Sequence, residues 1–338
     1  MNNLLSIGNL EVGPGELKRG GIPIGGDMYS RERQIPIIVC RGVEDGPTLW
    51  INGATHGDEP EGAFSIFLAL KEIDPRQLRG TVVAVPAMNV DAFTAGKRGD
   101  PLDGFTYDMN RVYPGKVDGY PTERVAWAHW MAMKECCDLQ ISVHSGGEHS
   151  YLAHMIFASD NDVSQELAAA MGPQWSLVFK SPVGGGNPSS QIAGLGKAGI
   201  TVELGGNCRT LTADFQAVAG DLAASYLNVM RHYGMVAGSA AYAESWRQGH
   251  QIALLAPATG MFVGNPDLEF ETELATGTLL GQIYDLYGDV IAEVRAPETG
   301  VVFGLRSRPS VLEGEWCCFF GVVEETVTDL IAPEKRER

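Results

Sequence analysis

The sequence has no long apolar run and few basic residues, and each of these gaps excludes a class of protein. No stretch approaches the roughly 18 consecutive apolar residues of a membrane-spanning helix, so we expect no membrane segment and no membrane partner. Lys and Arg total 25 against 42 Asp and Glu, so the net charge is −17. A chain this acidic has no general attraction for phosphate backbones, which excludes nucleic acid as its main partner.

Cysteine is also sparse, and none of the six cysteines forms a C-x-x-C motif. Cys136 and Cys137 are adjacent, as are Cys317 and Cys318, so their spacing predicts neither a zinc finger nor a redox dithiol. Reduced thiols in a folded core are typical of cytosolic proteins. The first residues lack a basic segment followed by an apolar one, so we expect no signal peptide and a cytoplasmic location.

What the sequence does contain is an alternation of strand-like and helix-like runs. Its 338 residues, 44% of them hydrophobic, can bury a sizeable core. Residues 1–44 combine Gly, Pro and short β-type runs, which predicts a strand-rich segment. Between residues 45 and 240, strand-like runs alternate with amphipathic helical runs, which predicts an α/β domain with a mixed sheet flanked by helices. The strand-like runs are 48–53, 80–89, 138–147 and 199–206, and the helical runs are 60–73, 122–137 and 212–234.

Residues 245–332 have a different sequence pattern, in which short apolar runs separated by glycine turns predict an all-β domain. The two halves of this segment repeat one another, since A-P-A-T-G at 256–260 matches A-P-E-T-G at 296–300. The repeat resembles the two halves of a biotinyl/lipoyl-like β-sandwich. No lysine lies between Lys197 and Lys335 to hold such a cofactor, so a carrier role is excluded. We expect a structural element, a lid or an assembly element, and because such domains often pair, a homo-oligomer is a candidate assembly.

The strongest chemical signal is the segment N-G-A-T-H-G-D-E-P-E-G at 52–62. His56 and Glu59 lie three residues apart in a predicted turn between a strand and a helix, so both side chains can reach the same point. His144, at another predicted strand end, is the natural third ligand. Two imidazoles and a carboxylate suit Zn²⁺ with one position left open for water. Taken alone, the H-G-x-E pattern is weak, and a histidine after a strand is more often structural than metal-binding.

Two further features add polar groups to this predicted centre. The loop at 96–115 contains Arg98, Asn110 and Arg111. An arginine beside an amide can bind a substrate carboxylate, and a second arginine can polarise a carbonyl, whereas the structural alternative is a solvated loop. Glu203 lies within an apolar predicted strand, where burial raises a carboxyl pKa toward values useful to a general base. The alternative for Glu203 is an ion-paired core glutamate.

The remaining polar residues have less specific interpretations. Asp108 is a candidate for orienting His56 from outside the metal site. The Gly- and Ser-rich segment 181–196 is either a wall of the pocket or a plain surface loop. We expect structural roles for the histidines outside the predicted metal set, although one of them, His149, is close enough to His144 in sequence to line the same cleft. These histidines are His129, His149, His154, His232 and His250.

Taken together and in this order, His56-x-x-Glu59, a D-x-N-R motif, His144 and a strand glutamate resemble the succinylglutamate desuccinylase/aspartoacylase family. That family is a branch of the zinc carboxypeptidase-like hydrolases, and the resemblance covers about residues 45–235. It implies a zinc-carboxypeptidase-like fold, with a C-terminal β domain as in bacterial members. It also implies one Zn²⁺ per chain, held by His56, Glu59 and His144.

The resemblance assigns roles to the other candidate residues as well. Arg98 would polarise the scissile carbonyl of the substrate. Asn110 and Arg111 would bind the free carboxylate of the substrate. Glu203 would activate a water molecule and then protonate the leaving amine.

Two positions depart from the common pattern of the family. Asp58 stands where many members have asparagine, and Ser142 stands where many have aspartate. Asp58 is not a ligand position, and Ser142 would alter a contact around His144. Neither change removes a predicted ligand.

We therefore predict a zinc-dependent hydrolase that cleaves the amide bond of a small N-acyl amino acid or a related N-acyl compound. Removal of acetyl from an N-acetylated diamino acid is one member of this class. The alternative is a carboxypeptidase or amidase acting on a small peptide-like substrate, since the same arginines can hold a C-terminal carboxylate. A catalytically silent binding protein is a third hypothesis, which the presence of all three ligands and the candidate base opposes.

Overall fold

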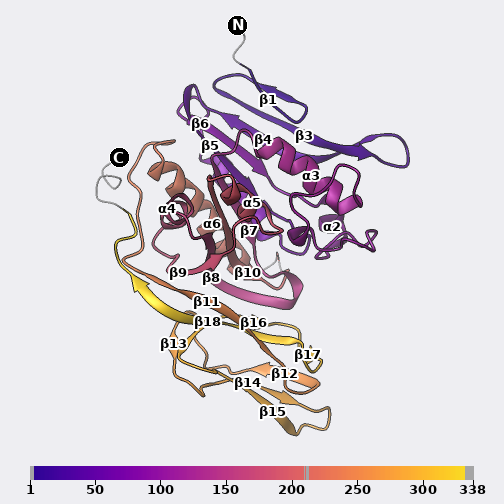
Figure 1. Ribbon diagram of the computed structural model, residues 1–338, viewed down its shortest axis with the longest axis vertical. Coiled ribbons are helices and arrows are strands. Elements are labelled where there is room, and N and C mark those ends of the chain that lie inside the picture. Colours follow the sequence, from indigo (N-terminus) through magenta and orange to yellow (C-terminus); the bar gives the residue numbers. More distant parts are fainter. Residues whose placement is uncertain (1–3, 209, 211–212, 332–338) are drawn as a thin grey trace.

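The computed structural model describes residues 4–208, 210 and 213–331, and one long sheet runs through both ends of the molecule (Figure 1). This sheet has twelve strands. In spatial order they are β13 (Glu273–Leu274), β16 (Gly300–Arg306), β18 (Trp316–Val327), β11 (Trp246–Leu255), β9 (Leu177–Ser181), β8 (Ser150–Ser159), β10 (Ala198–Gly206), β7 (Leu139–His144), β5 (Glu44–Asn52), β6 (Arg79–Val85), β4 (Glu32–Arg41) and β3 (Glu16–Gly26).

Four neighbouring strands in the middle of this sheet, β10, β7, β5 and β6, are parallel. Parallel strands are normally covered on both faces, and every residue of β7 is buried. The helices α1 (Glu61–Lys71), α4 (Asp162–Ala170) and α6 (Ala213–His232) pack on one face. The helices α3 (Pro121–Met133) and α5 (Pro188–Gly194) pack on the other. The predicted mixed α/β architecture is therefore confirmed, and the carboxyl ends of β5, β7 and β10 lie side by side.

Beyond β10, five strands of the sheet close into a ring. β8 pairs with β9 through residues 156–159 and with β16 through residues 150–152. β9, β11, β18 and β16 then pair in turn, which completes the ring. An apolar cluster that includes Met155, Phe179 and Phe303 joins β8, β9 and β16. The C-terminal strands are thus hydrogen-bonded directly to the strands that precede α6.

After α6, every element that the structure describes is a strand. β12 (Gly260–Gly264), β14 (Leu279–Tyr284), β15 (Val290–Arg295) and β17 (Ser310–Val311) form a second sheet in the order β15-β14-β12-β17. This sheet packs against strands of the long sheet through a core that contains Phe262, Ile283 and Phe320. The two A-P-x-T-G segments lead into β12 and β16, so the sequence repeat corresponds to equivalent strand starts.

Short elements complete the fold. β1 (Leu5–Ile7) and β2 (Leu10–Val12) form a separate hairpin, so the N-terminal segment contributes strands β1 to β4. α2 (Val90–Ala95) and the 3₁₀ turn η1 (Met109–Arg111) lie between β6 and α3, and the 3₁₀ turn η2 (Gly147–His149) follows β7. The segment 181–196 is only partly loop, because it includes α5, whose N-terminus is capped by the Asn187 side chain accepting from Ser190 N–H. None of the described helices is long and apolar enough to cross a membrane.

Candidate metal centre and active site

Two elements of the central sheet bring the predicted ligands together. His56 and Glu59 lie in the turn between β5 and α1, and His144 is the last residue of β7. β5 and β7 are parallel neighbours, so the turn and the strand end meet at the same edge of the sheet. Gly57 lets the turn pack tightly, because a Cβ at this position would lie 2.0 Å from the carbonyl carbon of Ala92 in α2.

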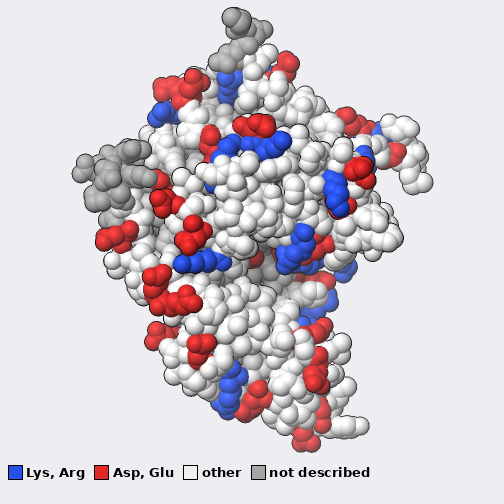
Figure 2. Space-filling model, in the orientation of Figure 1, with Lys and Arg blue, Asp and Glu red and all other residues white. Residues whose placement is uncertain are grey.

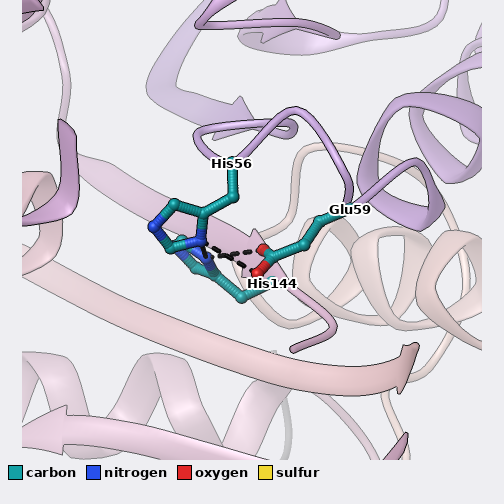
Figure 3. Close-up of side chains that lie close together, drawn as sticks. All are labelled: His56, Glu59 and His144. Carbon is teal, nitrogen blue, oxygen red and sulfur yellow. Dashed lines mark hydrogen bonds and ion pairs between the residues drawn. The ribbon is translucent and has the colours of Figure 1, made fainter. Parts of the chain in front are cut away.

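The side chains of His56, Glu59 and His144 converge on one point (Figure 3). Nδ1 of His56 lies 2.9 Å from Oε1 of Glu59, and Nδ1 of His144 lies 2.8 Å from Oε2 of Glu59. The two Nδ1 atoms are 3.2 Å apart. One nitrogen or oxygen atom from each residue lies within 4.8 Å of the others, and each residue is only 2% exposed. This arrangement forms the candidate metal centre.

The outer nitrogen of each imidazole also has a partner. Nε2 of His56 lies 3.0 Å from Oδ1 of Asp108, and Nε2 of His144 lies 3.3 Å from Oγ of Ser142. If each Nε2–H donates to these oxygens, both Nδ1 atoms present their lone pairs to the shared point, as metal-binding histidines require. Asp108 therefore contacts the outer nitrogen of His56, as the sequence predicts. Ser142 contacts the outer nitrogen of His144 although its side chain is shorter than that of aspartate.

The charges of the cluster residues shift one another's pKa values. Burial raises the pKa of Glu59, but the charges of His56 and His144 outweigh burial and hold that pKa well below its usual range. Burial lowers the pKa of His56, yet the charge of Glu59 and the hydrogen bond with Asp108 raise it to about 9. The donor set of two imidazoles and one carboxylate, buried and oriented from outside, fits Zn²⁺.

Glu203 lies next to this cluster in β10. In the sheet register it is opposite His144 of β7 on one side and Met155 of β8 on the other. Its Oε2 atom is buried and has no hydrogen-bond partner among the described residues. Burial, and then the negative charge of Glu59, raise the pKa of Glu203 to about 8. A carboxyl group in this state can take up and release a proton near neutral pH.

The loop between β6 and α3 supplies the polar residues predicted for substrate binding. Nε and Nη2 of Arg98 donate to Oδ2 of Asp108, at 3.2 and 3.0 Å, and Nη1 lies 3.8 Å from Oε1 of Glu59. Oδ1 of Asn110 is buried without a hydrogen-bond partner in the described structure. Arg111 is exposed, and its Nη1 donates to the carbonyl oxygen of Asn110. The loop therefore brings two guanidinium groups and a free amide oxygen to the cluster.

One cavity of about 450 Å³ is lined by His56, Glu59, Arg98, Asn110, Arg111 and Glu203, whereas His144, Asp108 and Ser142 lie behind its surface. Figure 2 shows a hollow between the upper body and the C-terminal strands, with basic side chains on its rim. Ser181 and Asn187 also line the cavity, so the segment 181–196 contributes to its wall, and so does His149.

Several cavity residues have no counterpart in the sequence-based prediction. Leu152, Met155 and Phe157 come from β8, and the C-terminal strands add four more residues. These four are Gln251, Phe303, Trp316 and Phe319. An aromatic residue in a strand is typical of a core, so nothing in the local sequence distinguishes these side chains from ordinary packing. Their position follows only from the pairing of β16 with β8.

The structure thus defines an α/β protein with a buried His–Glu–His cluster and a raised-pKa carboxyl group in one cavity. A family model described as the succinylglutamate desuccinylase/aspartoacylase catalytic domain matches residues 45–232. This match covers more than half of the chain, so the protein belongs to the succinylglutamate desuccinylase/aspartoacylase family.

Individual relatives resemble the chain over most of its length. An N-alpha-acetyl-L-2,4-diaminobutyric acid deacetylase from Halomonas elongata is 29% identical over 310 residues, which are 87% of each chain. A succinylglutamate desuccinylase structure from Silicibacter has a TM-score of 0.80 at 24% identity and covers 96% of this chain and 99% of its own. The product-bound ectoine utilization protein EutE (DoeB) from Ruegeria pomeroyi also has a TM-score of 0.80 at 24% identity, over 95% and 99% of the two chains. The two structures show that the fold is shared, including the C-terminal strands.

Proposed function

We propose that this protein is a zinc-dependent deacylase that hydrolyses the amide bond of a small N-acyl amino acid. The observation that carries the proposal is the buried Oε2 of Glu203, which has no hydrogen-bond partner among the described residues and lies at the cavity that His56 and Glu59 also line. A structural glutamate in a core would be paired, whereas this carboxyl group is free to exchange a proton. The name of the Halomonas relative, a deacetylase of an N-acetyl amino acid, supports the same class of reaction.

His56, Glu59 and His144 would hold the metal ion. A bound Zn²⁺ supplies Lewis acidity and lowers the pKa of water, which together make amide hydrolysis feasible at neutral pH. Asp108 keeps the His56 ring in place, because its carboxylate lies 3.0 Å from the outer ring nitrogen. Ser142 does the same for His144.

The residues around the cluster would carry the proton transfers and bind the substrate. Glu203 takes a proton from the attacking water and delivers it to the leaving amine nitrogen. Arg98 stabilises the negative charge that develops on the carbonyl oxygen, because its guanidinium lies within 3.8 Å of Glu59 at the cluster. Asn110 and Arg111 bind the free carboxylate of the substrate.

The cavity favours a small substrate over a peptide. The cavity has a volume of about 450 Å³, and Phe303, Trp316 and Phe319 from the C-terminal strands form one of its walls, so it has room for a small substrate rather than for a peptide chain that extends on both sides of the scissile amide. For this reason we favour the deacylase over a carboxypeptidase.

We also propose domain boundaries and a cellular compartment for this protein. We infer a carboxypeptidase-like catalytic domain over 45–240, after the strand-rich segment 1–44, and a biotinyl/lipoyl-like sandwich over 245–332 without a carrier function. All six cysteines are free thiols, which supports a reducing compartment such as the cytoplasm.

The direct test is release of amine from a panel of N-acetyl, N-succinyl and N-formyl amino acids by zinc-loaded protein. We expect release from at least one member, its loss with a chelator, and its recovery when zinc is restored. Release that a chelator leaves unchanged would overturn the metal-dependent reaction. No release from any member would overturn the proposed substrate class.

A further inference from the structure

The cavity has two chemically different sides, and one of them has no part in the chemistry proposed above. Six of its residues form what we call the apolar wall. They are Leu152, Met155, Phe157, Phe303, Trp316 and Phe319. We propose that the apolar wall binds an apolar group, preferably an aromatic one, on an N-acyl amino acid substrate. This inference rests on the proposed function and names the substrate class of the same site.

The apolar wall begins directly beside the reacting centre. In the antiparallel register of β10 and β8, Met155 lies opposite Glu203 and Phe157 lies opposite Thr201. Residues opposite each other in a sheet point to the same face, with Cβ atoms about 5 Å apart. Met155 and Phe157 therefore lie on the face of the sheet that carries Glu203. Phe157 keeps part of its surface exposed and can contact a group attached close to the scissile amide, whereas Met155 is 1% exposed and packs behind the cavity surface.

The wall continues as a packed set of aromatic rings on β16 and β18. The rings of Phe303 and Phe319 have centroids 5.9 Å apart and planes within 9°, and those of Trp316 and Phe319 are 4.5 Å apart and within 8°. Phe303 is fully buried, whereas Trp316 and Phe319 keep part of their surface exposed. Gly304 allows this packing, because a Cβ there would lie 2.5 Å from Cδ2 of Leu152. The rings are thus held in place with part of their surface still free to contact a ligand.

No carboxylate among the described residues that line the cavity is left to pair with a cationic side chain at this wall. Among the described residues that line the cavity, the carboxylates are Glu59 and Glu203, and both are assigned to the metal and to proton transfer. The guanidinium groups of Arg98 and Arg111 also line it and would repel a substrate ammonium. A substrate with one carboxylate for the arginines and an apolar group for the wall satisfies both sides. This differs from the diaminobutyrate side chain named for the Halomonas relative.

The test compares kcat/KM for substrates that carry the apolar group in different places. N-acetyl-L-phenylalanine and N-acetyl-L-leucine carry it on the amino acid, and N-benzoylglycine carries it on the acyl group. N-acetylglycine, N-acetyl-L-aspartate and N-acetyl-L-2,4-diaminobutyrate serve as comparison substrates. We expect kcat/KM for at least one apolar substrate to exceed that for all three comparison substrates by about tenfold or more, which is the effect of burying one side chain. Whether the better substrate carries its apolar group on the amino acid or on the acyl group identifies which part of the substrate contacts the wall.

Variants of the wall provide the second readout. In Phe319→Ala and Trp316→Ala we expect kcat/KM for the preferred apolar substrate, divided by that for N-acetylglycine, to fall about tenfold. This ratio does not depend on how much of the variant is folded. Phe319→Leu should keep most of the ratio, and Tyr287→Ala, which replaces an aromatic side chain 96% exposed in the turn between β14 and β15, should keep all of it.

The outcomes separate this inference from the proposed function. Efficient hydrolysis of the diaminobutyrate or aspartate substrate, with the apolar ones no better than N-acetylglycine, would overturn the apolar wall and leave the deacylase intact. An unchanged ratio in both alanine variants would also overturn it. Hydrolysis of none of the six substrates would overturn the apolar wall, whereas the deacylase proposal would be overturned only if the N-succinyl and N-formyl amino acids were not hydrolysed either.

Discussion

Among the single residues, Glu203 has the most specific role, because its pKa is raised to about 8 and its Oε2 has no hydrogen-bond partner in the described part of the chain. Replacing Glu203 with Gln keeps the shape and removes the proton acceptor. We expect kcat to fall by about 10²–10⁴-fold, the usual contribution of a general base, while metal binding stays intact. Steady-state kinetics and metal analysis on the same preparation measure both. A near wild-type rate with metal bound would show that another group accepts the proton.

Asp108 is predicted to act through His56 and Arg98 rather than on the substrate. Its two carboxylate oxygens accept from the outer nitrogen of His56 and from the guanidinium of Arg98. Asp108→Asn should weaken metal affinity by about 10–100-fold, as loss of such outer partners usually does. Competition with a chelator measures this affinity. Asp103→Asn is the matched control, since that carboxylate in the same loop accepts from Thr122 N–H and should change only stability.

At the residue scale, the sequence identified a set that the structure brings together. His56, Glu59 and His144 converge because strand ends in a parallel sheet meet at one edge, which spacing and pattern can predict. The roles of Arg98, Asn110 and Arg111 remain predictions, although all three residues line the cavity. The apolar wall was not predicted, because Phe303 and Phe319 have the same local pattern as core aromatics.

At the scale of elements, the contact of α3 with β5 predicts a pH-dependent stability. Nε1–H of Trp50 donates to Nε2 of His129 at 3.0 Å, and Nδ1 of His129 lies 2.9 Å from the Tyr113 hydroxyl. Burial lowers the pKa of His129 from 6.5 to about 3, so the folded state keeps it neutral. Below pH 6.5 the unfolded chain binds a proton that the folded chain does not. Stability from this group is therefore complete above 6.5 and is lost as pH falls toward 3.

The measurement is urea unfolding at about pH 5 and pH 6 for the wild type and for His129→Gln. As the pH falls from 6 to 5, His129 should lower the unfolding free energy of the wild type by about 1.4 kcal/mol per pH unit. The variant should lack this contribution. Equal pH slopes in the two proteins would mean that His129 does not stay neutral in the folded state.

The elements themselves could be predicted only where local signals are strong. Expected helices at 60–73 and 212–234 correspond to α1 and α6, whose apolar faces repeat with helical periodicity. The strand expected at 80–89 ends at Val85, because Pro86 follows and has no backbone N–H to donate. α5 lies in a Gly- and Ser-rich segment that the composition assigns to a loop, and its start depends on a side-chain cap at Asn187.

At the scale of the whole molecule, the continuous sheet predicts that the C-terminal strands and the central sheet unfold together. β11 pairs with β9 and β16 pairs with β8, so separating the two parts would break sheet hydrogen bonds and expose Phe179 and Phe303. We expect the urea transition followed by far-ultraviolet circular dichroism to coincide with that followed by tryptophan fluorescence of a variant retaining only Trp316. Two separated transitions would mean that the C-terminal part is an independent unit. The sequence predicted the change to all-β structure near residue 245, but pairing between strands far apart in the chain, such as Arg247 with Leu177 and Gly304 with Leu152, leaves no local signal.

Whether His56, Glu59 and His144 hold the metal ion that amide hydrolysis needs is tested most directly by metal analysis combined with activity. The wild type and His144→Ala would be analysed for bound metal and for amine release in the same samples, with circular dichroism as the check on folding. We expect one zinc ion per wild-type chain, and loss of both metal and hydrolysis in the folded variant. Hydrolysis by metal-free wild-type protein, or a variant that keeps its metal and its rate, would contradict the proposed metal centre.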